Sequence, residues 1–225
     1  TLKTEFDTKY GQYPAMFNNV LLQSEPNLQI SSYEVQFGKY PASLDECDAY
    51  LITGSKVSAY DDIAWINELK KFIRSLHQYQ KKLIGICFGH QIIAAALGGS
   101  VKRSKKGWHV GIHAATLKKN TALFGSTEQE FHLIYNHQDQ VITMPRESTL
   151  LASCKNCPIA MLSIADHILS FQGHIEFEIA YARDLLKMRR SILGEDVYLK
   201  AYNSLNATSE ETKVTDWILK FLKKY

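Results

Sequence analysis

The sequence predicts an α/β fold with a mostly parallel central sheet, and three observations predict it. Short apolar runs alternate with longer stretches in which apolar residues recur every three or four positions. A strand, a helix and a second strand follow one another in this way in the first half of the chain, which is typical of a parallel sheet. The hydrophobic content of 45% over 225 residues is sufficient for one sizeable core.

The first clear unit runs from residue 49 to residue 87. Residues 49–53 and 83–87 are apolar runs of strand length, and each ends in turn residues. Between them a helical stripe of apolar side chains contains Ile63, Ile66, Leu69, Ile73 and Leu76. Asp61 or Asp62 is expected to cap the start of this helix. Together these segments predict a right-handed crossover between two parallel strands.

A second helix and a strand-rich region follow. The helix covers residues 91–97 and is expected to end at the glycine pair 98–99. The predicted strands are residues 111–117, 131–135, 150–153, 159–164 and 167–172. The last three lie close together along the chain, with Asp166 at a tight turn, so we expect antiparallel pairing there.

The final part of the chain is predicted to be helical. The expected helices are residues 179–193, 197–205 and 211–224. The last of them has Val214, Trp217, Ile218, Phe221 and Leu222 on one face, so it is expected to dock on the body. With no linker or repeat visible, residues 1–225 are expected to form a single domain on which residues 178–225 pack. The fold also requires a first strand, for which only residues 2–6 are available.

Composition and charge exclude several classes of protein. The 26 basic and 23 acidic residues give a formal net charge of +3, which is too mild for a nucleic-acid-binding protein. No apolar run approaches the roughly 20 residues that span a bilayer, and residues 1–12 do not resemble a secretion signal. We therefore expect a cytoplasmic protein that contacts neither membrane nor nucleic acid. The basic segment 102–108 is interpreted as a solvated loop.

The cysteines and histidines do not form a recognisable metal motif. Cys154 and Cys157 form a C-x-x-C pair, but no second pair and no helix-borne histidine pair completes a zinc set. This pattern favours two structural thiols at the end of a strand and its turn over a redox or metal site. Four histidines also lack the spacing to a carboxylate or cysteine cluster that metal ligands show: His109, His113, His132 and His167. The sequence therefore predicts neither a metal nor a cofactor.

Cys87 lies in a different local context. Residues 85–91 read G-I-C-F-G-H-Q, a glycine-flanked nucleophile between an apolar strand and a helix. Glycine is needed on both sides because the nucleophile occupies a strained turn in which neighbouring side chains would clash. The N-terminus of the following helix favours a thiolate, and the backbone N–H of Phe88 can donate to a developing oxyanion. A buried core thiol between chance glycines is the less favoured alternative.

A base for such a thiol is available near the end of the last predicted strand. His174 and Glu176 are two residues apart, so an extended chain directs both side chains to the same side. The imidazole can then face Cys87 while the carboxylate holds its other nitrogen. An isolated H-x-E would be weak evidence, but together with a cysteine elbow it indicates a Cys–His–Glu triad.

These motifs make the chain resemble class I glutamine amidotransferases, the family that uses such a triad. The resemblance rests on segments 52–61, 85–91 and 173–176, in that order, and extends from about Tyr10 to the end. Residues 150–153 and 171–174 resemble the free-standing branch, which includes plant γ-glutamyl peptidases. The resemblance implies a flavodoxin-like three-layer sandwich with a small antiparallel section.

The resemblance also implies roles for individual residues. Cys87 matches the nucleophile, His174 the base and Glu176 the orienting carboxylate. Gly54 and Phe88 match the backbone donors of the oxyanion hole. The residues that match substrate-binding positions are Gln91 in the elbow and Asn136, Gln138 and Asp139 in the loop 135–141. Two positions depart from the family pattern, Gln138 where glycine is common and Ile175 where proline is usual.

The implied function is hydrolysis of a γ-glutamyl amide through a cysteine thioester, without a cofactor. The small-molecule substrate is either glutamine or a γ-glutamyl peptide, and both stay open at this point. The chain has no room for a synthetase domain, so ammonia from glutamine would require a synthetase or other acceptor enzyme in trans. The alternative is a non-enzymatic stress or scaffold protein of the same superfamily, with a redox-sensitive elbow cysteine. A scaffold does not need His174 and Glu176, whereas a hydrolase does.

Overall fold

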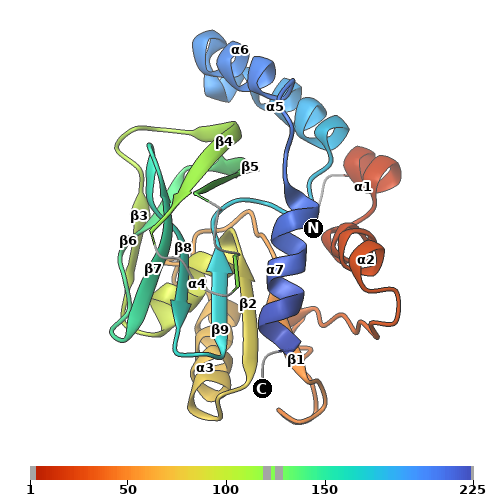
Figure 1. Cartoon of the computed structure of the whole chain (residues 1–225), viewed down its shortest axis with the longest axis vertical. Helices are drawn as coiled ribbons and strands as arrows, with labels where there is room; N and C mark the ends of the chain where they lie inside the picture. Colours follow the sequence, from red (N-terminus) through yellow and green to blue (C-terminus); the bar gives the residue numbers. More distant parts are fainter. Residues whose placement is uncertain (1–3, 119–122, 125–128, 224–225) are drawn as a thin grey trace.

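The computed structural model describes residues 4–118, 123–124 and 129–223 and shows a three-layer arrangement (Figure 1). Side chains of successive residues in the central strands point to opposite faces, so Leu83 and Ile84 of one strand belong to different core clusters. One cluster joins the sheet to two helices on one face, and the other joins it to two helices on the other face. The predicted α/β fold class is confirmed.

The strands are β1 (Ala49–Ile52), β2 (Lys82–Ile86), β3 (Ser100–Arg103), β4 (His109–Leu117), β5 (Glu130–His137), β6 (Asp139–Thr143), β7 (Ser148–Cys154), β8 (Cys157–Ile164) and β9 (Ile168–Phe171). In the described part of the chain, seven form one sheet in the order β1-β2-β9-β8-β7-β4-β5, and β3 pairs with β6. The strands β1, β2 and β9 are parallel. All pairings from β9 to β5 are antiparallel, so the antiparallel section is larger than expected.

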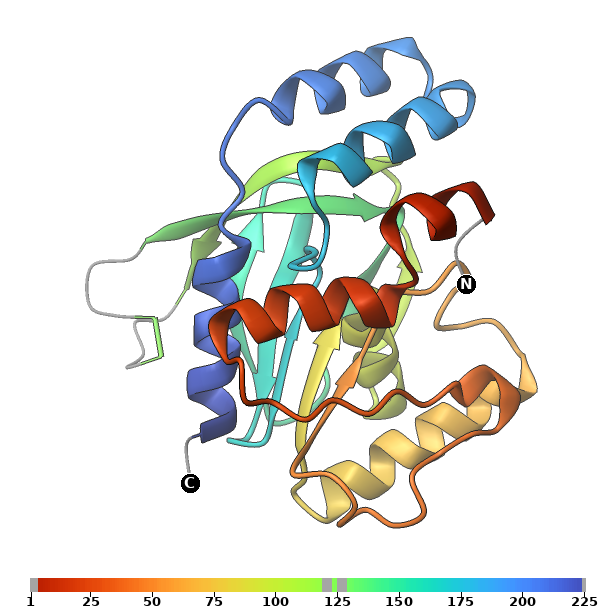
Figure 2. The same ribbon diagram turned by 90° about the vertical axis from the view of Figure 1, so that its right-hand side faces the viewer.

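The helices are α1 (Thr4–Tyr10), α2 (Tyr13–Ser24), the 3-10 turn η1 (Val35–Phe37), α3 (Ala64–Gln78), α4 (Phe88–Ala96), α5 (Ile179–Leu193), α6 (Glu195–Ser204) and α7 (Glu211–Lys223). Helices α3 and α4 cover one face of the sheet. Helices α2 and α7 cover the other face, where Figure 2 shows them side by side. The buried face of α7 carries Val214, Trp217, Ile218 and Phe221.

The unit β1–α3–β2 is the predicted parallel crossover. Tyr50 pairs with Leu83 in register, and α3 buries Ile66, Leu69, Ile73 and Leu76 as expected. The predicted aspartate cap is wrong, because the N-cap residue is Ile63 and its side chain makes no capping hydrogen bond. Asp61 instead accepts a hydrogen bond from the Ser58 amide at 2.9 Å, inside the preceding loop.

The N-terminal segment departs most from the sequence prediction. Residues 4–10 form helix α1 rather than a first strand, and residues 2–3 lie outside the described part. The segment 2–6 is polar for a central strand, and β1 serves as the first strand of the parallel section. The start of the basic segment 102–108 is also not a loop, since Lys102 and Arg103 belong to β3.

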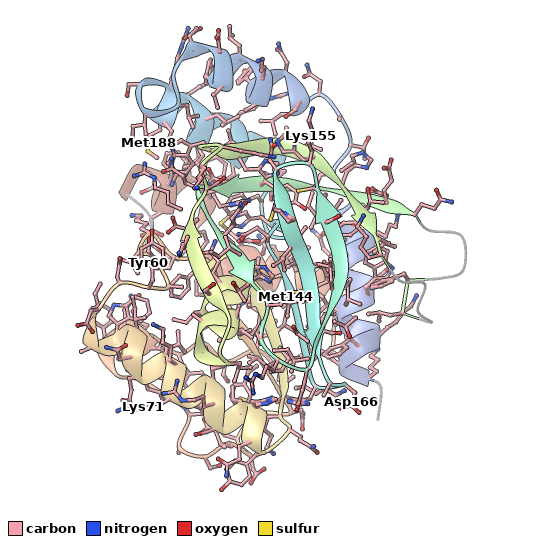
Figure 3. The ribbon with its side chains drawn as sticks, turned by 90° about the vertical axis from the view of Figure 1, so that its left-hand side faces the viewer. Tyr60, Lys71, Met144, Lys155, Asp166 and Met188 are labelled. Carbon is pink, nitrogen blue, oxygen red and sulfur yellow. The ribbon has the colours of Figure 1, made fainter. Side chains whose placement is uncertain are left out.

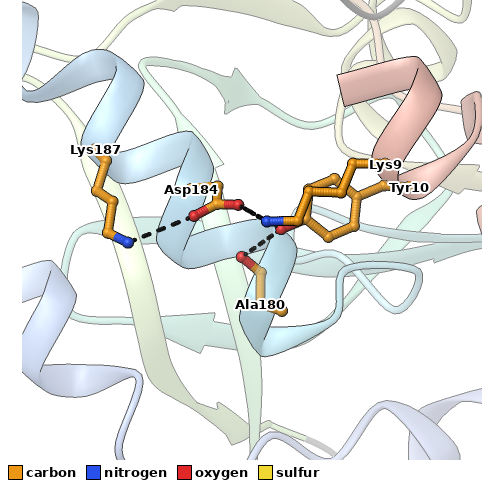
Figure 4. A network of polar contacts seen from close by, with 5 residues as sticks. All are labelled: Lys9, Tyr10, Ala180, Asp184 and Lys187. Carbon is orange, nitrogen blue, oxygen red and sulfur yellow. Dashed lines mark hydrogen bonds and ion pairs between the residues drawn. The ribbon is translucent and has the colours of Figure 1, made fainter. Parts of the chain in front are cut away.

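Helices α1, α5 and α6 surround a third core cluster near one end of β4 and β5. Figure 4 shows how α1 is fastened to α5: Lys9 and Tyr10 both donate to Asp184 Oδ2 at 2.6 Å. Lys187 lies 3.5 Å from the other oxygen of the same carboxylate. In the same view the Tyr10 hydroxyl is also joined to the carbonyl of Ala180.

The β7–β8–β9 meander lies in the middle of the sheet, between the parallel strands β1 and β2 on one side and β4 and β5 on the other. Figure 3 shows Lys155, in the turn between β7 and β8, at the opposite end from Asp166, in the turn between β8 and β9. The second turn produces the antiparallel pairing of β8 and β9 that the sequence predicts. Across residues 4–118, 123–124 and 129–223, no helix has both the length and the apolar character needed to cross a bilayer.

Candidate active site

Cys87 occupies a strained turn between β2 and α4. Its backbone φ is 54° and ψ is −101°, in a region that residues other than glycine rarely adopt. The turn is fixed from both sides, because the Cys87 amide donates to the carbonyl of Phe171 at 2.8 Å and the Cys87 carbonyl accepts from Gln91. The thiol-bearing residue is 8% exposed and lies at the N-cap position of α4. It therefore faces the positive end of a helix.

The two glycines of the elbow are required by close backbone contacts. A Cβ atom at Gly89 would lie 2.1 Å from the carbonyl oxygen of Ile52, and one at Gly85 would lie 2.7 Å from the carbonyl carbon of Gly89. Neither distance is compatible with a side chain. The sequence-based expectation that glycine is needed on both sides of Cys87 is confirmed.

His174 and Glu176 follow β9 and form a buried pair. His174 Nδ1 donates to Glu176 Oε1 at 2.8 Å, and the two residues are 3% and 4% exposed. The histidine backbone is held by a hydrogen bond to the Ile134 carbonyl, and its ring stacks on Phe177 at 3.8 Å between centroids. Ile175 between them is buried. The expectation that the two side chains lie on one side of the backbone is met.

The electrostatics of His174 link it to Cys87 as well as to Glu176. Burial by itself lowers the pKa of His174, but the attraction of Glu176 and Cys87 outweighs burial and raises this pKa to about 10. Its other nitrogen, Nε2, is buried and has no hydrogen-bond partner among the described residues. Nε2 is thus the atom of this ring that remains available for a proton exchange.

Gly54 lies beside the imidazole, near the start of the loop that follows β1. A Cβ atom at Gly54 would be 3.6 Å from His174 Cε1, so the absence of a side chain keeps this edge of the ring open. Phe88 is the first residue of α4, and the amides of a first helical turn have no intrahelical acceptor. The structure thus brings Gly54, Phe88, Cys87 and His174 into one neighbourhood.

Gln91 and Asp139 form a network next to the elbow. Gln91 Nε2 donates to the Asp139 carbonyl at 2.7 Å and to Gln172 Oε1 at 3.1 Å. The Asp139 carboxylate accepts hydrogen bonds from the hydroxyls of Ser58 and Tyr60. Two loops singled out in the sequence, 52–61 and 135–141, therefore meet through one aspartate. In this arrangement Gln91 holds protein groups in position.

Asn136 and Gln138 are engaged elsewhere. Asn136 Oδ1 accepts a hydrogen bond from Arg189 of α5 at 2.7 Å, and the Gln138 carbonyl accepts one from the Ser104 amide at 2.8 Å. No described contact joins either residue to Cys87, His174 or Gln91. Of the four substrate-binding residues expected from the resemblance, the structure joins Gln91 and Asp139 by a hydrogen bond, whereas the hydrogen bonds described for Asn136 and Gln138 go to Arg189 and Ser104.

Tyr13, at the start of α2, is a neighbour of the site that sequence reasoning missed. Its ring stacks with Phe177, and its Cζ atom lies 4.0 Å from the Cβ position of Gly54. Burial raises the pKa of Tyr13 well above its ordinary value, and the nearby charges of Tyr181, Glu176 and Cys87 add to this effect. A tyrosine before a helical proline has no sequence signal for such a role, because only the fold brings it to Gly54.

A cavity of about 230 Å³ borders Glu176 and Tyr181 on the side of α1 and α2. The second oxygen of the Glu176 carboxylate, Oε2, is buried and has no hydrogen-bond partner among the described residues. The carboxylate thus uses one oxygen for His174. In the described part of the chain, no group of three or more histidine, cysteine, aspartate or glutamate side chains could hold a metal ion.

Known proteins resemble this chain in sequence and in fold. The family model described as glutamine amidotransferase class-I matches residues 10–188. Gamma-glutamyl peptidase 3 of Arabidopsis thaliana is 37% identical over 79% of this chain and 74% of its own length. Gamma-glutamyl peptidase 4 of the same plant is 36% identical over 83% of this chain and 75% of its own length. A glutamine amidotransferase structure from Thermotoga maritima superimposes with a TM-score of 0.73 at 19% identity, over 92% of this chain and 89% of that one.

Proposed function

The chain belongs to the class I glutamine amidotransferase family, and from this premise we propose that it is a cysteine-dependent hydrolase of γ-glutamyl amide bonds. The observation that carries the proposal is the buried His174–Glu176 pair. Nε2 of His174 has no hydrogen-bond partner among the described residues, and Glu176 and Cys87 together raise the pKa of this imidazole. A buried ion pair stabilises a fold weakly at best, so a catalytic role accounts for it better than a structural one. The scaffold alternative leaves the pair without a purpose.

In the proposed reaction the Cys87 thiolate attacks the carbonyl carbon of the γ-glutamyl amide. The carbonyl electron pair moves to the oxygen, which the backbone amides of Phe88 and Gly54 stabilise as an oxyanion. When the carbonyl reforms, the C–N bond breaks and the amine departs with a proton from His174 Nε2. The product of this half-reaction is a thioester between Cys87 and the γ-glutamyl group.

Water completes the cycle. Neutral His174 accepts a proton from the water that attacks the thioester, and the C–S bond breaks to release glutamate and the thiolate. Glu176 transfers no proton in either step, since it orients the imidazole and stabilises its charged form. The 2.8 Å bond from Nδ1 to its carboxylate is suited to both tasks.

The leaving group separates two versions of this function. Relatives named gamma-glutamyl peptidases, at 36% and 37% identity, favour an amino acid or a peptide as the leaving group. If ammonia left instead, the protein would be a glutaminase that supplies an acceptor enzyme in trans. We favour the peptidase, which requires no partner.

Product analysis tests the proposal. The purified protein is incubated separately with free glutamine, a γ-glutamyl dipeptide and a γ-glutamyl tripeptide, and free glutamate, ammonia and released amino acid are quantified. We expect release of the amino acid or dipeptide to exceed release of ammonia from glutamine. Hydrolysis of glutamine alone would overturn the peptidase version, and no hydrolysis of any γ-glutamyl amide would overturn the proposal as a whole.

A further inference from the structure

A second pair of cysteines lies outside the proposed hydrolase site, in the hairpin of β7 and β8. Cys154 ends β7 and Cys157 begins β8, and they are partners in the antiparallel register. Directly opposed residues of antiparallel strands have Cα atoms about 4.5–5.5 Å apart, within the range that a disulfide spans. Both cysteines are free thiols in this structure. The pairing of the two residues is therefore compatible with a disulfide between them.

The two thiols differ in their surroundings. Cys157 is 0% exposed, and its thiol donates to the carbonyl of Ile159 at 3.5 Å. Cys154 is half-buried, and its sulfur lies 3.5 Å from Nε2 of His109. His109 is itself 4% exposed and stacks on His113 with ring centroids 4.0 Å apart. Cys157 is thus sealed in the core, whereas Cys154 is only partly buried and its sulfur faces an imidazole.

These surroundings determine which sulfur is the better nucleophile. The neighbouring Cys157 thiol lowers the pKa of Cys154; burial opposes this effect, and the His109 ring adds to it. Conversely, Cys154 and burial raise the pKa of Cys157. A thiolate is the reactive form of cysteine, so the less buried cysteine is also the one that ionises more readily. This combination of a reactive thiol and an adjacent protonated thiol is typical of redox-active pairs.

We propose that Cys154 and Cys157 form a peroxide-reactive dithiol, a modification site separate from the hydrolase centre. The Cys154 thiolate attacks one oxygen of a hydroperoxide, the O–O bond breaks, and the leaving alkoxide or hydroxide takes up a proton. The sulfur of Cys157 then attacks the resulting sulfenic acid, forming the S–S bond and releasing water. The two thiols are oxidised by two electrons in total, and the hydroperoxide is reduced by two. A small dithiol reductant reverses the change.

The chain itself supplies a specific readout of this bond. Trypsin cleaves after Lys155, between the two cysteines, so Cys154 and Cys157 end in the separate peptides 147–155 and 156–183. Treatment of the whole protein with one equivalent of hydrogen peroxide, followed by alkylation and digestion, should yield these two peptides joined. Prior treatment with dithiothreitol should separate them. The experiment uses the Cys87→Ser variant alongside the wild type, so that oxidation at the elbow is not involved.

Single substitutions assign the order of attack. In Cys157→Ser, a sulfenic-acid trap should label residue 154, whereas in Cys154→Ser the sealed thiol at residue 157 should remain unlabelled. Cys47, which is also half-buried but belongs to another region, is the internal reference. We expect Cys154 to react about tenfold faster than Cys47, because a larger thiolate fraction is partly offset by lower nucleophilicity. Equal rates at both, or a disulfide joining Cys157 to another cysteine, or no linked peptide in either protein, would overturn the proposal.

Discussion

The Cys87 elbow and the Cys154–Cys157 hairpin both present a cysteine at the end of a strand, but they do so by opposite means. At the elbow the backbone is strained, with φ at 54°, and the partner His174 comes from a distant part of the chain. In the hairpin the turn contains only residues 155–156, and Cys157 lies directly opposite Cys154 on the neighbouring strand. The comparison teaches that long-range packing creates the first thiol site, whereas a local turn creates the second.

One acceptor connects the two regions. The carbonyl of Ile159 accepts a hydrogen bond from the Cys157 thiol and lies 3.1 Å from Nε2 of His90, in the first turn of α4. His90 Nδ1 lies 2.8 Å from the hydroxyl of Ser170 in β9. A neutral His90 can donate to the carbonyl and accept from the serine, so both of its nitrogens are satisfied. His90 thus joins α4, the helix after the elbow, to β8 and β9 through hydrogen bonds.

Substitution of the elbow cysteine should have the largest effect on turnover and should distinguish the role of Cys87 from that of Cys154. We expect Cys87→Ser to abolish γ-glutamyl hydrolysis, since loss of the nucleophile in a comparable triad costs about 10⁶ in turnover. Cys154→Ser, the matched change in the hairpin, should keep near-native turnover. Steady-state rates of both variants on one γ-glutamyl peptide provide the check. If Cys87→Ser retained substantial turnover, the thioester mechanism would be wrong.

Glu176→Gln should have the second largest effect. The amide has the same shape as the carboxylate and Oε2 has no partner among the described residues, so the side chain can keep its place, but the amide cannot stabilise a charged imidazole. We expect turnover to fall by about 10² to 10⁴ with little change in KM. The smaller end of this range applies if the thiolate needs less assistance than a serine does. A variant with unchanged turnover and a raised KM would contradict the orienting role of Glu176.

Acidification should test the connection that His90 makes. Burial lowers the pKa of His90 from 6.5 to about 4. Between these values the unfolded chain binds a proton that the folded chain does not, so the free energy of unfolding should fall as pH drops from 6.5 to 4. This group can contribute about 3 kcal/mol to the loss. The loss begins as pH falls below about 6.5 and is complete below about pH 4.

Urea denaturation at pH 7 and at pH 4.5 measures this effect in the wild type and in His90→Gln. The variant should be less stable at pH 7 but should lose less stability on acidification. His174 cannot be the source of an acid loss. Its pKa is raised to about 10, so its contribution is present below about pH 6.5 and is lost as pH rises through 10. An equal acid loss in both proteins would show that His90 is not responsible.

The two regions also differ in how far the sequence predicts them. The glycines around Cys87 and the spacing of His174 and Glu176 are local patterns, and the structure agrees with both. The wrong predictions concern partners that local patterns do not specify. A first strand was expected at residues 2–6, but residues 4–10 are helical, and β1 begins the parallel section without them. The strands β3 and β6 pair with each other although they are far apart in the sequence, and neither contains a clear apolar run.

The same distinction between local pattern and fold applies to the residues that were expected to bind substrate. Gln91 and Asp139 meet only because the β5–β6 turn reaches the elbow helix, which sequence spacing does not encode. Asn136 is adjacent in sequence to this turn, yet Arg189 of α5 engages its side chain. In the hairpin, by contrast, sequence spacing does bring Cys154 and Cys157 together, but His109 beside them comes from β4. Local proximity is readable from the sequence, and chemical environment depends on the fold.

Tyr13→Phe should have the smallest effect and shows whether α2 contributes to the elbow site. The substitution removes only a hydroxyl, and the stacking of the ring on Phe177 is preserved. Because Cys87 and Glu176 are among the charges that act on this hydroxyl, its loss should alter the reacting groups directly. We expect a fall of about fivefold in kcat/KM, mainly through kcat, which corresponds to about 1 kcal/mol.

Tyr10→Phe is the matched control for this change. The Tyr10 hydroxyl bonds to Asp184 and the Ala180 carbonyl, which belong to the contact between α1 and α5. Its removal should lower thermal stability and leave both kinetic constants unchanged. If Tyr13→Phe behaved in the same way, the tyrosine would serve only to pack α2 against the sheet. A fall in kcat for Tyr13→Phe alone would instead show that the environment of Cys87 depends on α2, which lies far from Cys87 in the sequence. Cys154 and Cys157, in contrast, are brought together by a two-residue turn.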